Sequence, residues 1–288
     1  MQVERLWLYT IQKELGTISF NVQGFSKFKY GSTYQARQYG LALAKLFFKY
    51  YARELLNKKT YITCSAYKTV PNAAYNLMSY VQLGLNHYLY HYYKAPPIDY
   101  EPLRRETLYE ADYGKLSFQE REMVMQKNLL YINEKAITKT QIILVDDIRV
   151  TGLHEDRITV LLEKCGVEKV YYLYVINANV AEPSLEHELN HAFVKRLCHL
   201  KVLMQEEDYQ INSRVCRFLL AYHPKEELSN FFKELPPWLL EKLYSYFLAD
   251  GYNTMPNYQE GFKIFFKHYS KQSSAFTLLQ DFEAVLPP

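Results

Sequence analysis

Residues 141–155, with the sequence QIILVDDIRVTGLHE, restrict the possible folds of this chain more than any other segment. The four apolar residues 142–145 follow one another without alternation, as in a central parallel strand that is buried on both faces. Asp146 and Asp147 end that strand, a short loop with a Thr-Gly dipeptide follows, and apolar residues at helical spacing then begin. The order of strand, acidic pair, loop and helix predicts an α/β fold.

This arrangement suits a ligand that carries both a phosphate and a sugar. The start of a helix offers unpaired backbone N–H groups and the positive end of the helix dipole, which together bind a phosphate well. Asp146 and Asp147 can accept hydrogen bonds from sugar hydroxyls and help to hold Mg²⁺, directly or through water. We therefore expect a phosphosugar site at the end of this strand.

The pattern of an apolar strand, Asp-Asp, three residues and Thr-Gly resembles the motif with which type I phosphoribosyltransferases bind 5-phosphoribosyl 1-pyrophosphate (PRPP). The resemblance implies that Asp146 and Asp147 contact the ribose hydroxyls and act in catalysis, and that the following loop wraps the 5′-phosphate. The residues that it places in this loop are Arg149, Val150, Thr151, Gly152, Leu153 and His154.

Two positions depart from the family pattern. Hydroxyl-bearing residues are common in the family where this chain has Val150 and His154, although the backbone N–H groups remain and His154 can itself donate. Purine-salvage members have a carboxylate at the position of Val150, so its absence argues against hypoxanthine or guanine as the substrate. The alternative is another doubly wound fold in which these residues only end a strand.

A second informative stretch spans residues 61–71, where a short strand enters a loop of small residues and Pro71 opens a helix over 72–93. By the resemblance, this loop binds the pyrophosphate of PRPP, and its Tyr-Lys pair is similar to that of the orotate branch. The alternative for the lysine is an ordinary surface position in a turn. We also expect a non-proline cis peptide within residues 65–68. The pyrophosphate-binding candidates are Ser65, Ala66, Tyr67 and Lys68, with Lys68 also catalytic.

Residues 95–116 contain few helix signals, and we expect an extended segment near 98–104 followed by a loop. In the family, a hood closes over the active site and brings basic residues to the leaving pyrophosphate. Arg104, Arg105 and Lys115 are the candidates here, with ordinary surface charge as the alternative. A capping box at residues 117–120 predicts a helix that ends near residue 133.

The remainder of the first part alternates between strand and helix signals. Asn177 and Asn179 follow the last of these strands and are candidates for the acceptor pocket by the resemblance, although asparagine is also common in turns. Lys27 and Lys29 could line a site, but a solvated face is the favoured interpretation. The predicted elements are strands over 3–11, 17–22 and 169–177, and a helix over 34–56 capped by Ser32 or Thr33.

From residue 184 onward the sequence predicts helices separated by Pro and Gly. We therefore expect an α/β domain over residues 1–182 and a helical domain over 183–288 that caps the active site, forms a homodimer or binds a partner. Its aromatic residues, Trp238 among them, predict a core of its own. The predicted helices are 184–201, 208–222, 226–233, 237–249, 256–269 and 275–284.

The sequence HELNH at residues 187–191 matches the HExxH pattern of zinc hydrolases, with His187 and His191 as ligands and Glu188 as the base. It follows a strand of an apparent nucleotide-binding fold, which is not the architecture of zinc proteases. We keep the zinc hydrolase as a remote alternative.

Composition limits the remaining classes of protein. The net charge of +3 across 288 residues provides no strong field for nucleic acid, and no apolar run is long enough to span a membrane. The four cysteines form no CxxC pair, which favours reduced, buried thiols. With no signal segment, we expect a soluble cytoplasmic protein.

The function implied by the resemblance is transfer of ribose 5-phosphate from PRPP to a nitrogen nucleophile of a nucleobase-like small molecule, with Mg²⁺ as cofactor and release of pyrophosphate. A regulator that senses PRPP or a nucleotide without transfer is the second interpretation. The expected fold is a type I phosphoribosyltransferase-like parallel sheet flanked by helices, with a C-terminal helical extension.

Overall fold

A computed structural model describes residues 1–11, 20–106, 129–178 and 184–273. Its centre is a five-stranded sheet in the order β1-β7-β6-β2-β3, in which all neighbouring strands are parallel. The predicted α/β fold is therefore confirmed. The strands are β1 (Gln2–Ile11), β2 (Thr60–Cys64), β3 (Asp99–Tyr100), β6 (Gln141–Arg149) and β7 (Lys169–Ala178).

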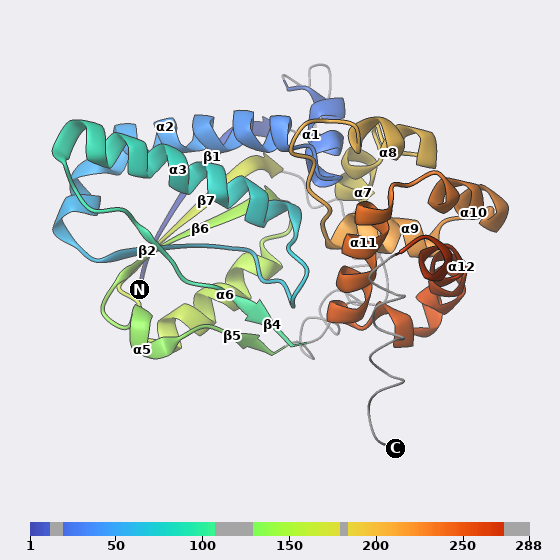
Figure 1. The fold of residues 1–288 in the computed structure, drawn as a ribbon. Helices are drawn as coiled ribbons and strands as arrows, with labels where there is room; N and C mark the ends of the chain where they lie inside the picture. Colours follow the sequence, from blue (N-terminus) through green and yellow to red (C-terminus); the bar gives the residue numbers. More distant parts are fainter. Residues whose placement is uncertain (12–19, 107–128, 179–183, 274–288) are drawn as a thin grey trace.

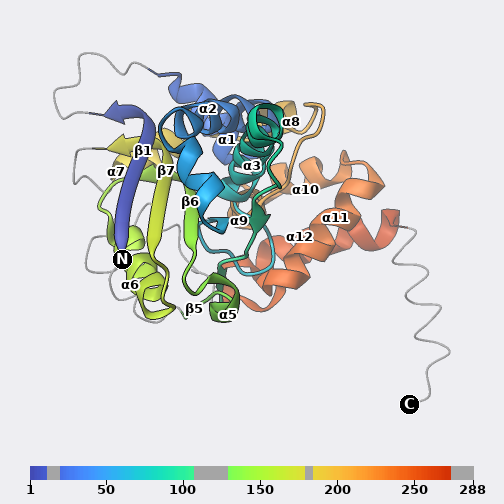
Figure 2. The same cartoon turned by 90° about the vertical axis from the view of Figure 1, so that its left-hand side faces the viewer.

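Helices cover both faces of this sheet (Figures 1 and 2). α2 (Thr33–Asn57) and α3 (Ala73–Tyr93) pack on one face, and α5 (Glu134–Ile137) and α6 (Leu153–Lys164) lie on the other. Alternate residues of β6 divide between the two faces. Ile143 and Val145 join the core under α2 and α3, while Ile142 joins the core under α6. The uninterrupted apolar run of β6 is thus explained by burial on both sides.

The N-terminal region departs from the predicted pair of strands. β1 pairs in parallel with β7, and the next described element is the helix α1 (Val22–Lys29) in place of a strand over 17–22. The Asn21 side chain accepts a hydrogen bond from the Gly24 N–H at 2.9 Å, which caps α1 and turns the chain into a helix. Residues 12–19 lie outside the described residues.

The starts of the two long helices follow local capping chemistry. Ser32 caps α2 as predicted, but Pro71 does not occupy the first turn of α3. Asn72 caps that helix instead, by accepting a hydrogen bond from the Tyr75 N–H at 3.0 Å.

The expected cis peptide within residues 65–68 is wrong, because the cis bond found in the described chain is His223–Pro224.

A small antiparallel pair, β4 (Arg104–Arg105) and β5 (Leu130–Tyr131), stands at the position of the expected hood. The predicted helix ending near residue 133 is wrong at its end, because residues 130 and 131 pair with β4. The rest of that prediction, residues 107–128 with Lys115, and the acceptor candidate Asn179 fall outside the described residues.

The C-terminal part consists of helices around one apolar core, to which Tyr30 and Val70 from the α/β part also contribute. The predicted helix over 184–201 is divided into two by non-helical residues 191–196. Trp238 is 62% exposed and does not belong to the predicted core. The elements are α7 (Ser184–Asn190), α8 (Leu197–Leu203), α9 (Ser213–Ala221), α10 (Lys225–Lys233), α11 (Pro237–Asp250), η2 (Tyr252–Thr254) and α12 (Pro256–Gln272).

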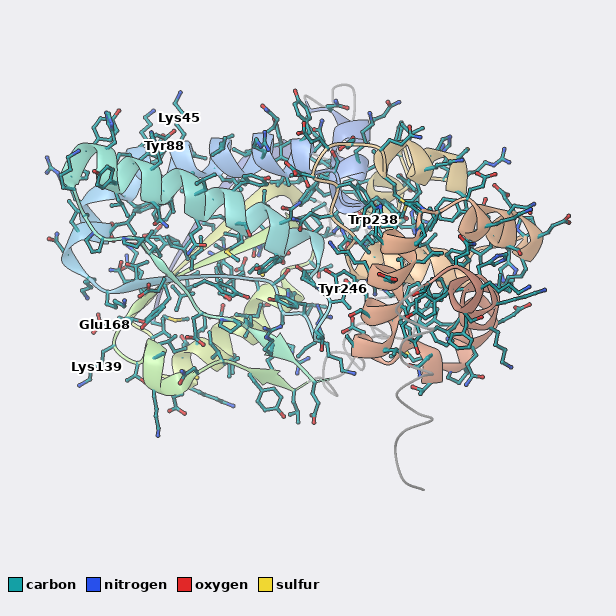
Figure 3. The ribbon with its side chains drawn as sticks, in the orientation of Figure 1. Lys45, Tyr88, Lys139, Glu168, Trp238 and Tyr246 are labelled. Atoms are coloured by element: carbon teal, nitrogen blue, oxygen red, sulfur yellow. The ribbon has the colours of Figure 1, made fainter. Side chains whose placement is uncertain are left out.

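The helical part lies beyond the carboxyl ends of the parallel strands. Lys139 and Glu168, which lie shortly before β6 and β7 in the chain, are at one end of the molecule, and Trp238 on α11 lies toward the other (Figure 3). In open parallel sheets, ligands bind at this carboxyl edge.

Among the described residues, no helix has the length and apolar character needed to cross a membrane. Of the cysteines, Cys198 is exposed, contrary to the prediction, and the other three are buried.

Candidate functional site

A cavity of about 170 Å³ lies at the carboxyl end of β6. It is lined by the acidic pair, by the loop that leads into α6, by Ser65 and Asn72 from the β2–α3 connection, and by Arg105 of the hood pair. Residues of α1, α7 and α9 complete the wall. The two loops that the sequence singled out, about 80 residues apart, therefore meet at one cavity.

The acidic pair is partly withdrawn from solvent. The Asp147 N–H donates a hydrogen bond to Oδ1 of Asp146 at 2.9 Å. Burial and, secondarily, the neighbouring charge of Asp147 raise the pKa of Asp146 to about 7, although Ser65 and Lys29 act in the opposite direction. The site thus disfavours the charged form of Asp146, and a cation placed beside that carboxyl group would favour it.

Lys29 at the end of α1 supplies a cation from within the protein. Its side chain is 5% exposed, and its ammonium pairs with Oδ2 of Asp147 and lies 3.7 Å from Oε1 of Glu186 on α7. Glu186 Oε1 is in turn 3.8 Å from Nη2 of Arg214 on α9. A chain of alternating charges therefore runs from β6 into the helical part. The favoured solvated position for Lys29 is wrong, because α1 was not recognised as a helix and its buried face could not be assigned.

The loop between β6 and α6 has the geometry of a phosphate site. Gly152 has φ +81° and forms the N-cap of α6, so the first N–H groups of that helix lack intrahelical partners. Val150, Thr151 and His154 line the cavity beside it, together with Arg149, whereas Leu153 does not. Burial, together with the charge of Arg105, lowers the pKa of His154 to about 4, so its imidazole is neutral and can donate one hydrogen bond.

Glu155, in the first turn of α6, holds this loop through hydrogen bonds to its carboxylate. Its carboxylate accepts hydrogen bonds from Arg5 Nε at 2.8 Å, Arg149 Nε at 2.9 Å and Tyr174 Oη at 2.9 Å. Burial raises the pKa of Glu155, but these donors and the charges of the two arginines outweigh that effect and bring it below its usual value. One buried carboxylate thus joins β1, β7 and the cavity loop.

The predicted pyrophosphate loop contributes Ser65 to the cavity, while Ala66, Tyr67 and Lys68 do not line it. Asn72 Nδ2 donates to the carbonyl oxygen of Ser65 at 2.9 Å and to its hydroxyl at 3.2 Å, which fixes the residue beside the acidic pair. Lys68 points elsewhere, because its ammonium donates to the carbonyl oxygen of Asp250 at 3.2 Å.

The two hood arginines differ in their positions. Arg105 lines the cavity and donates from Nε to the carbonyl oxygen of Ala66 at 2.7 Å. Arg104 lies 4.6 Å from the centre of the Tyr67 ring and does not line the cavity. The predicted acceptor residue Asn177 does not line the cavity either, although it pairs in register with Arg149 of β6, which does.

Several cavity residues lay outside the sequence prediction. Arg214 and Arg217 are three positions apart on α9, so both project from one face, and that spacing was visible in the sequence. Nothing local indicated that this face meets the sheet, because the contact joins segments far apart in the chain. The other cavity residues of this kind are Asn72, Ile148, Glu155, Tyr174 and Glu186.

The HExxH histidines do not form a recognisable zinc site. His191 Nδ1 contacts the carbonyl oxygen of His187 at 2.9 Å, and its Nε2 contacts the Tyr30 hydroxyl at 3.2 Å, so both ring nitrogens have protein partners. Glu188 is exposed. Within the described ranges, no group of three or more His, Cys, Asp or Glu side chains has the arrangement of a metal site.

Comparison with known proteins gives one family and several solved structures. The family model described as PRTase ComF-like matches residues 3–265, a range that includes the cavity residues of both parts of the chain. No curated protein matches the chain.

The solved structures similar to this chain include two crystal forms of a hypoxanthine phosphoribosyltransferase from Staphylococcus aureus. They are 10% and 11% identical to it with TM-scores of 0.31 and 0.32, and cover 57% and 59% of this chain and 69% and 72% of their own. A hypoxanthine-guanine phosphoribosyltransferase from Bacillus anthracis is 15% identical with a TM-score of 0.32, over 53% of this chain and 74% of that one.

Proposed function

Because the chain belongs to the ComF-like phosphoribosyltransferase family, we propose that it transfers ribose 5-phosphate from PRPP to a nitrogen nucleophile and releases pyrophosphate. The observation that carries the proposal is the joint lining of one cavity by the acidic pair and the helix-start loop around Gly152. A ligand with a phosphate and a ribose needs a phosphate site and hydroxyl acceptors within the same cavity.

In this proposal, the 5′-phosphate lies at the start of α6. The backbone N–H groups there and the Thr151 hydroxyl donate to it, and neutral His154 adds one further donor. The ribose hydroxyls face Asp146 and Asp147. Positive charge for the pyrophosphate comes from Arg105, which already lines the cavity.

The donor set fits Mg²⁺ when PRPP is present. Mg²⁺ is bound in many enzymes by one or two carboxylates and by substrate phosphates, and Asp146 and Asp147 are the two carboxylates that would hold it here. Bound Mg²⁺ would neutralise charge on the leaving pyrophosphate. Lys29 leaves one oxygen of Asp147 for such a role, since its ammonium contacts the other.

The rate enhancement is expected to come from orientation and electrostatic stabilisation. As the bond from C1 to pyrophosphate breaks, positive charge develops on the ribose and negative charge on the leaving group. Asp146 and Asp147 lie where they can stabilise the first, and Arg105 and Lys29 can stabilise the second. Lys68 would take part only if it left its contact with Asp250.

A PRPP sensor that performs no transfer is the second candidate. Two observations favour it: hydroxyl side chains are absent at Val150 and His154, and the expected pyrophosphate lysine, Lys68, points away from the cavity. Such a protein would bind PRPP and release no pyrophosphate.

Pyrophosphate release separates the two candidates. Full-length protein, PRPP and Mg²⁺ would be incubated with a panel of nitrogen heterocycles, and pyrophosphate would be measured by a coupled assay, with Asp147→Asn as the inactive control. Acceptor-dependent release that the control lacks supports transfer. PRPP binding without release by any acceptor identifies the sensor.

A further inference from the structure

A second cavity, of about 520 Å³, opens within the helical part of the molecule. It is lined mainly by α9, by α7 and the residues that follow it, and by the start of α12, and Tyr30 from the α/β part completes it. The site proposed above makes no use of this space.

The two cavities are neighbours. Arg214 and Arg217 line both of them. Lys29 lines the first cavity, and its chain neighbour Tyr30 lines the second. Likewise, Glu186 lines the first cavity and its neighbour His187 lines the second. The ends of α1, α7 and α9 therefore lie where the two cavities adjoin, and the two arginines contribute to the lining of both.

The second cavity is rich in positive and imidazole groups. Among the described residues that line it, no Asp or Glu occurs, and the carboxylate that pairs with Arg214, that of Glu186, lines the first cavity instead. Such a lining favours an anionic ligand group. The basic and imidazole residues are His187, His191, Lys195, Arg214, Arg217 and His223.

Aromatic rings form the rest of the wall. Tyr30 and Phe218 meet edge to face with their centroids 5.3 Å apart, and Phe218 and Tyr222 do so at 5.5 Å. Tyr30 also contacts His191, and both residues line the cavity. Aromatic walls of this kind favour a flat ligand ring.

We propose that the second cavity is the acceptor site and that it takes a planar nitrogen heterocycle carrying an anionic group. This inference rests on the proposed transferase function. The anionic group lies among Lys195, Arg214 and Arg217, and the ring nitrogen lies where the two cavities adjoin, in contact with C1 of PRPP.

The transfer balances without a further reactant. The lone pair of the ring nitrogen forms the bond to C1 while the C1–O bond to pyrophosphate breaks. The electron pair of that bond leaves with pyrophosphate, and any proton on the nitrogen passes to water. The helical part would then supply acceptor specificity to a PRPP site built by the sheet.

Two matched pairs of small molecules test the inference by calorimetry on the full chain. Pyridine-3-carboxylate is compared with pyridine-3-carboxamide, and imidazole-4-carboxylate with imidazole-4-carboxamide, so that each pair differs in charge and hardly in shape. We expect at least one acid to bind on the order of tenfold more tightly than its amide. If neither acid binds more tightly than its amide, the inference is overturned.

Two variants locate the binding in the second cavity. Lys195→Gln removes an exposed charge that lines only this cavity, and Ala221→Trp fills space at the end of α9. Both should weaken acid binding at least fivefold and leave PRPP binding unchanged. Lys263→Gln, at an exposed position of α12 that does not line the cavity, is the control. Acid binding that neither cavity variant weakens also overturns the inference.

PRPP titrations on the same samples distinguish the two possible failures. If PRPP binds and the acids do not, the acceptor assignment fails and the proposed function stands. If the wild-type chain does not bind PRPP, the proposed function fails, and the acceptor role fails with it.

Discussion

At the residue scale, the site is held by carboxylates that are largely withdrawn from solvent and that are each paired with cations from other elements. Asp147 and Glu186 share Lys29, and Glu155 holds Arg5 and Arg149. A carboxylate withdrawn from water is costly unless it is paired and hydrogen-bonded, so these contacts strongly favour one arrangement of the surrounding elements. Removing one partner should therefore cost more than the loss of a surface ion pair.

Glu155→Gln tests this view. The change keeps the shape of the side chain but removes the charge that holds Arg5 and Arg149, and we expect the free energy of unfolding to fall by about 2 kcal/mol. That is less than for a fully buried pair, because the Arg5 side chain is 40% exposed and can be rehydrated. Urea denaturation measures the change. A loss no larger than that of Glu168→Gln, whose partner Lys58 is exposed, would contradict it.

The pH dependence of stability gives a separate prediction for the same residue. The pKa of folded Glu155 lies below its ordinary value of 4.5, so its stabilisation is present above pH 4.5 and is lost as the pH falls through the folded pKa. As the pH falls below 4.5, the wild type should lose more stability than Glu155→Gln. If the two proteins lost the same stability as the pH fell, Glu155 would not be the source of the acid sensitivity.

Individual site residues were predictable only where a motif fixed them. Asp146, Thr151 and Gly152 were found because their spacing is that of a continuous loop, which needs no tertiary contact to interpret. Lys68 was placed at the pyrophosphate by its position in sequence, yet its ammonium contacts Asp250 from the other end of the chain. A long lysine side chain can point in many directions, and only packing decides among them.

At the scale of elements, the loop from β6 to α6 depends on Gly152. This residue has φ +81°, and a Cβ added to it would lie 2.8 Å from Arg149 Nη2. A side chain at this position would both strain the backbone and displace an arginine that lines the cavity. The geometry of the loop and the ligand site should therefore change together.

Gly152→Ala should weaken PRPP binding on the order of tenfold and lower stability by about 1 kcal/mol. Gly166→Ala is the matched control, because Gly166 also has a left-handed backbone conformation, at φ +74°. A Cβ added there would meet only Thr138 Cγ2, at 3.4 Å. We expect a similar loss of stability there with unchanged PRPP affinity, both measured by calorimetry. Equal PRPP affinities for the two variants would contradict the role of Gly152.

The connection from β2 to α3 is held by the helical part. Asp250 Oδ1 accepts hydrogen bonds from the N–H groups of Thr69 and Val70, each at 3.0 Å. The same connection begins with Ser65 in the cavity. The last residue of α11 thus fixes a loop of the proposed site.

Asp250→Ala should expose these two N–H groups and speed hydrogen exchange at Val70 on the order of tenfold. Asp250→Asn keeps an acceptor oxygen at the same place and should retain most of the protection. Hydrogen exchange followed by NMR measures both variants. Unchanged protection in the alanine variant would show that the loop is held by other contacts.

The elements that the sequence predicted well are long and strongly patterned. β6 and β7 are nine and ten residues long with nearly continuous apolar side chains, and α2 carries the predicted Ser32 cap. β3, β4 and β5 have two residues each, too few to show any alternation. α1 was missed because its eight residues follow an apolar, β-like stretch, and only the Asn21 cap turns them into a helix.

At the scale of the whole molecule, the C-terminal helices form one wall of the proposed site. Arg214 and Arg217 reach the cavity from α9, and Glu186 reaches it from α7. The sequence indicated a helical part but not its place, because contacts such as the ion pair of Lys29 with Glu186 join segments far apart in the chain and leave no periodic signal. The expected boundary near residue 182 divides the chain into two patterns, whereas the cavity is shared by both.

The two parts should unfold together. Tyr30 and Val70 of the α/β part are buried in the helical core, and the ion pairs of Lys29 and Glu186 cross the same boundary. The chain has two tryptophans, Trp7 in β1 and Trp238 in α11, so Trp7→Phe and Trp238→Phe leave one reporter in each part. We expect coincident fluorescence midpoints in urea for the two variants. Separate midpoints would show that the parts unfold independently.

The most direct test of the central claim is calorimetric titration of the full chain with PRPP, with and without Mg²⁺. The comparison is with the Asp146→Asn/Asp147→Asn variant and, as a control, with Asp156→Asn at an exposed position of α6. We predict Mg²⁺-dependent binding in the micromolar range that the double variant loses and the control keeps. Absence of PRPP binding by the wild type, or equal binding by the double variant, would contradict the assignment of this cavity.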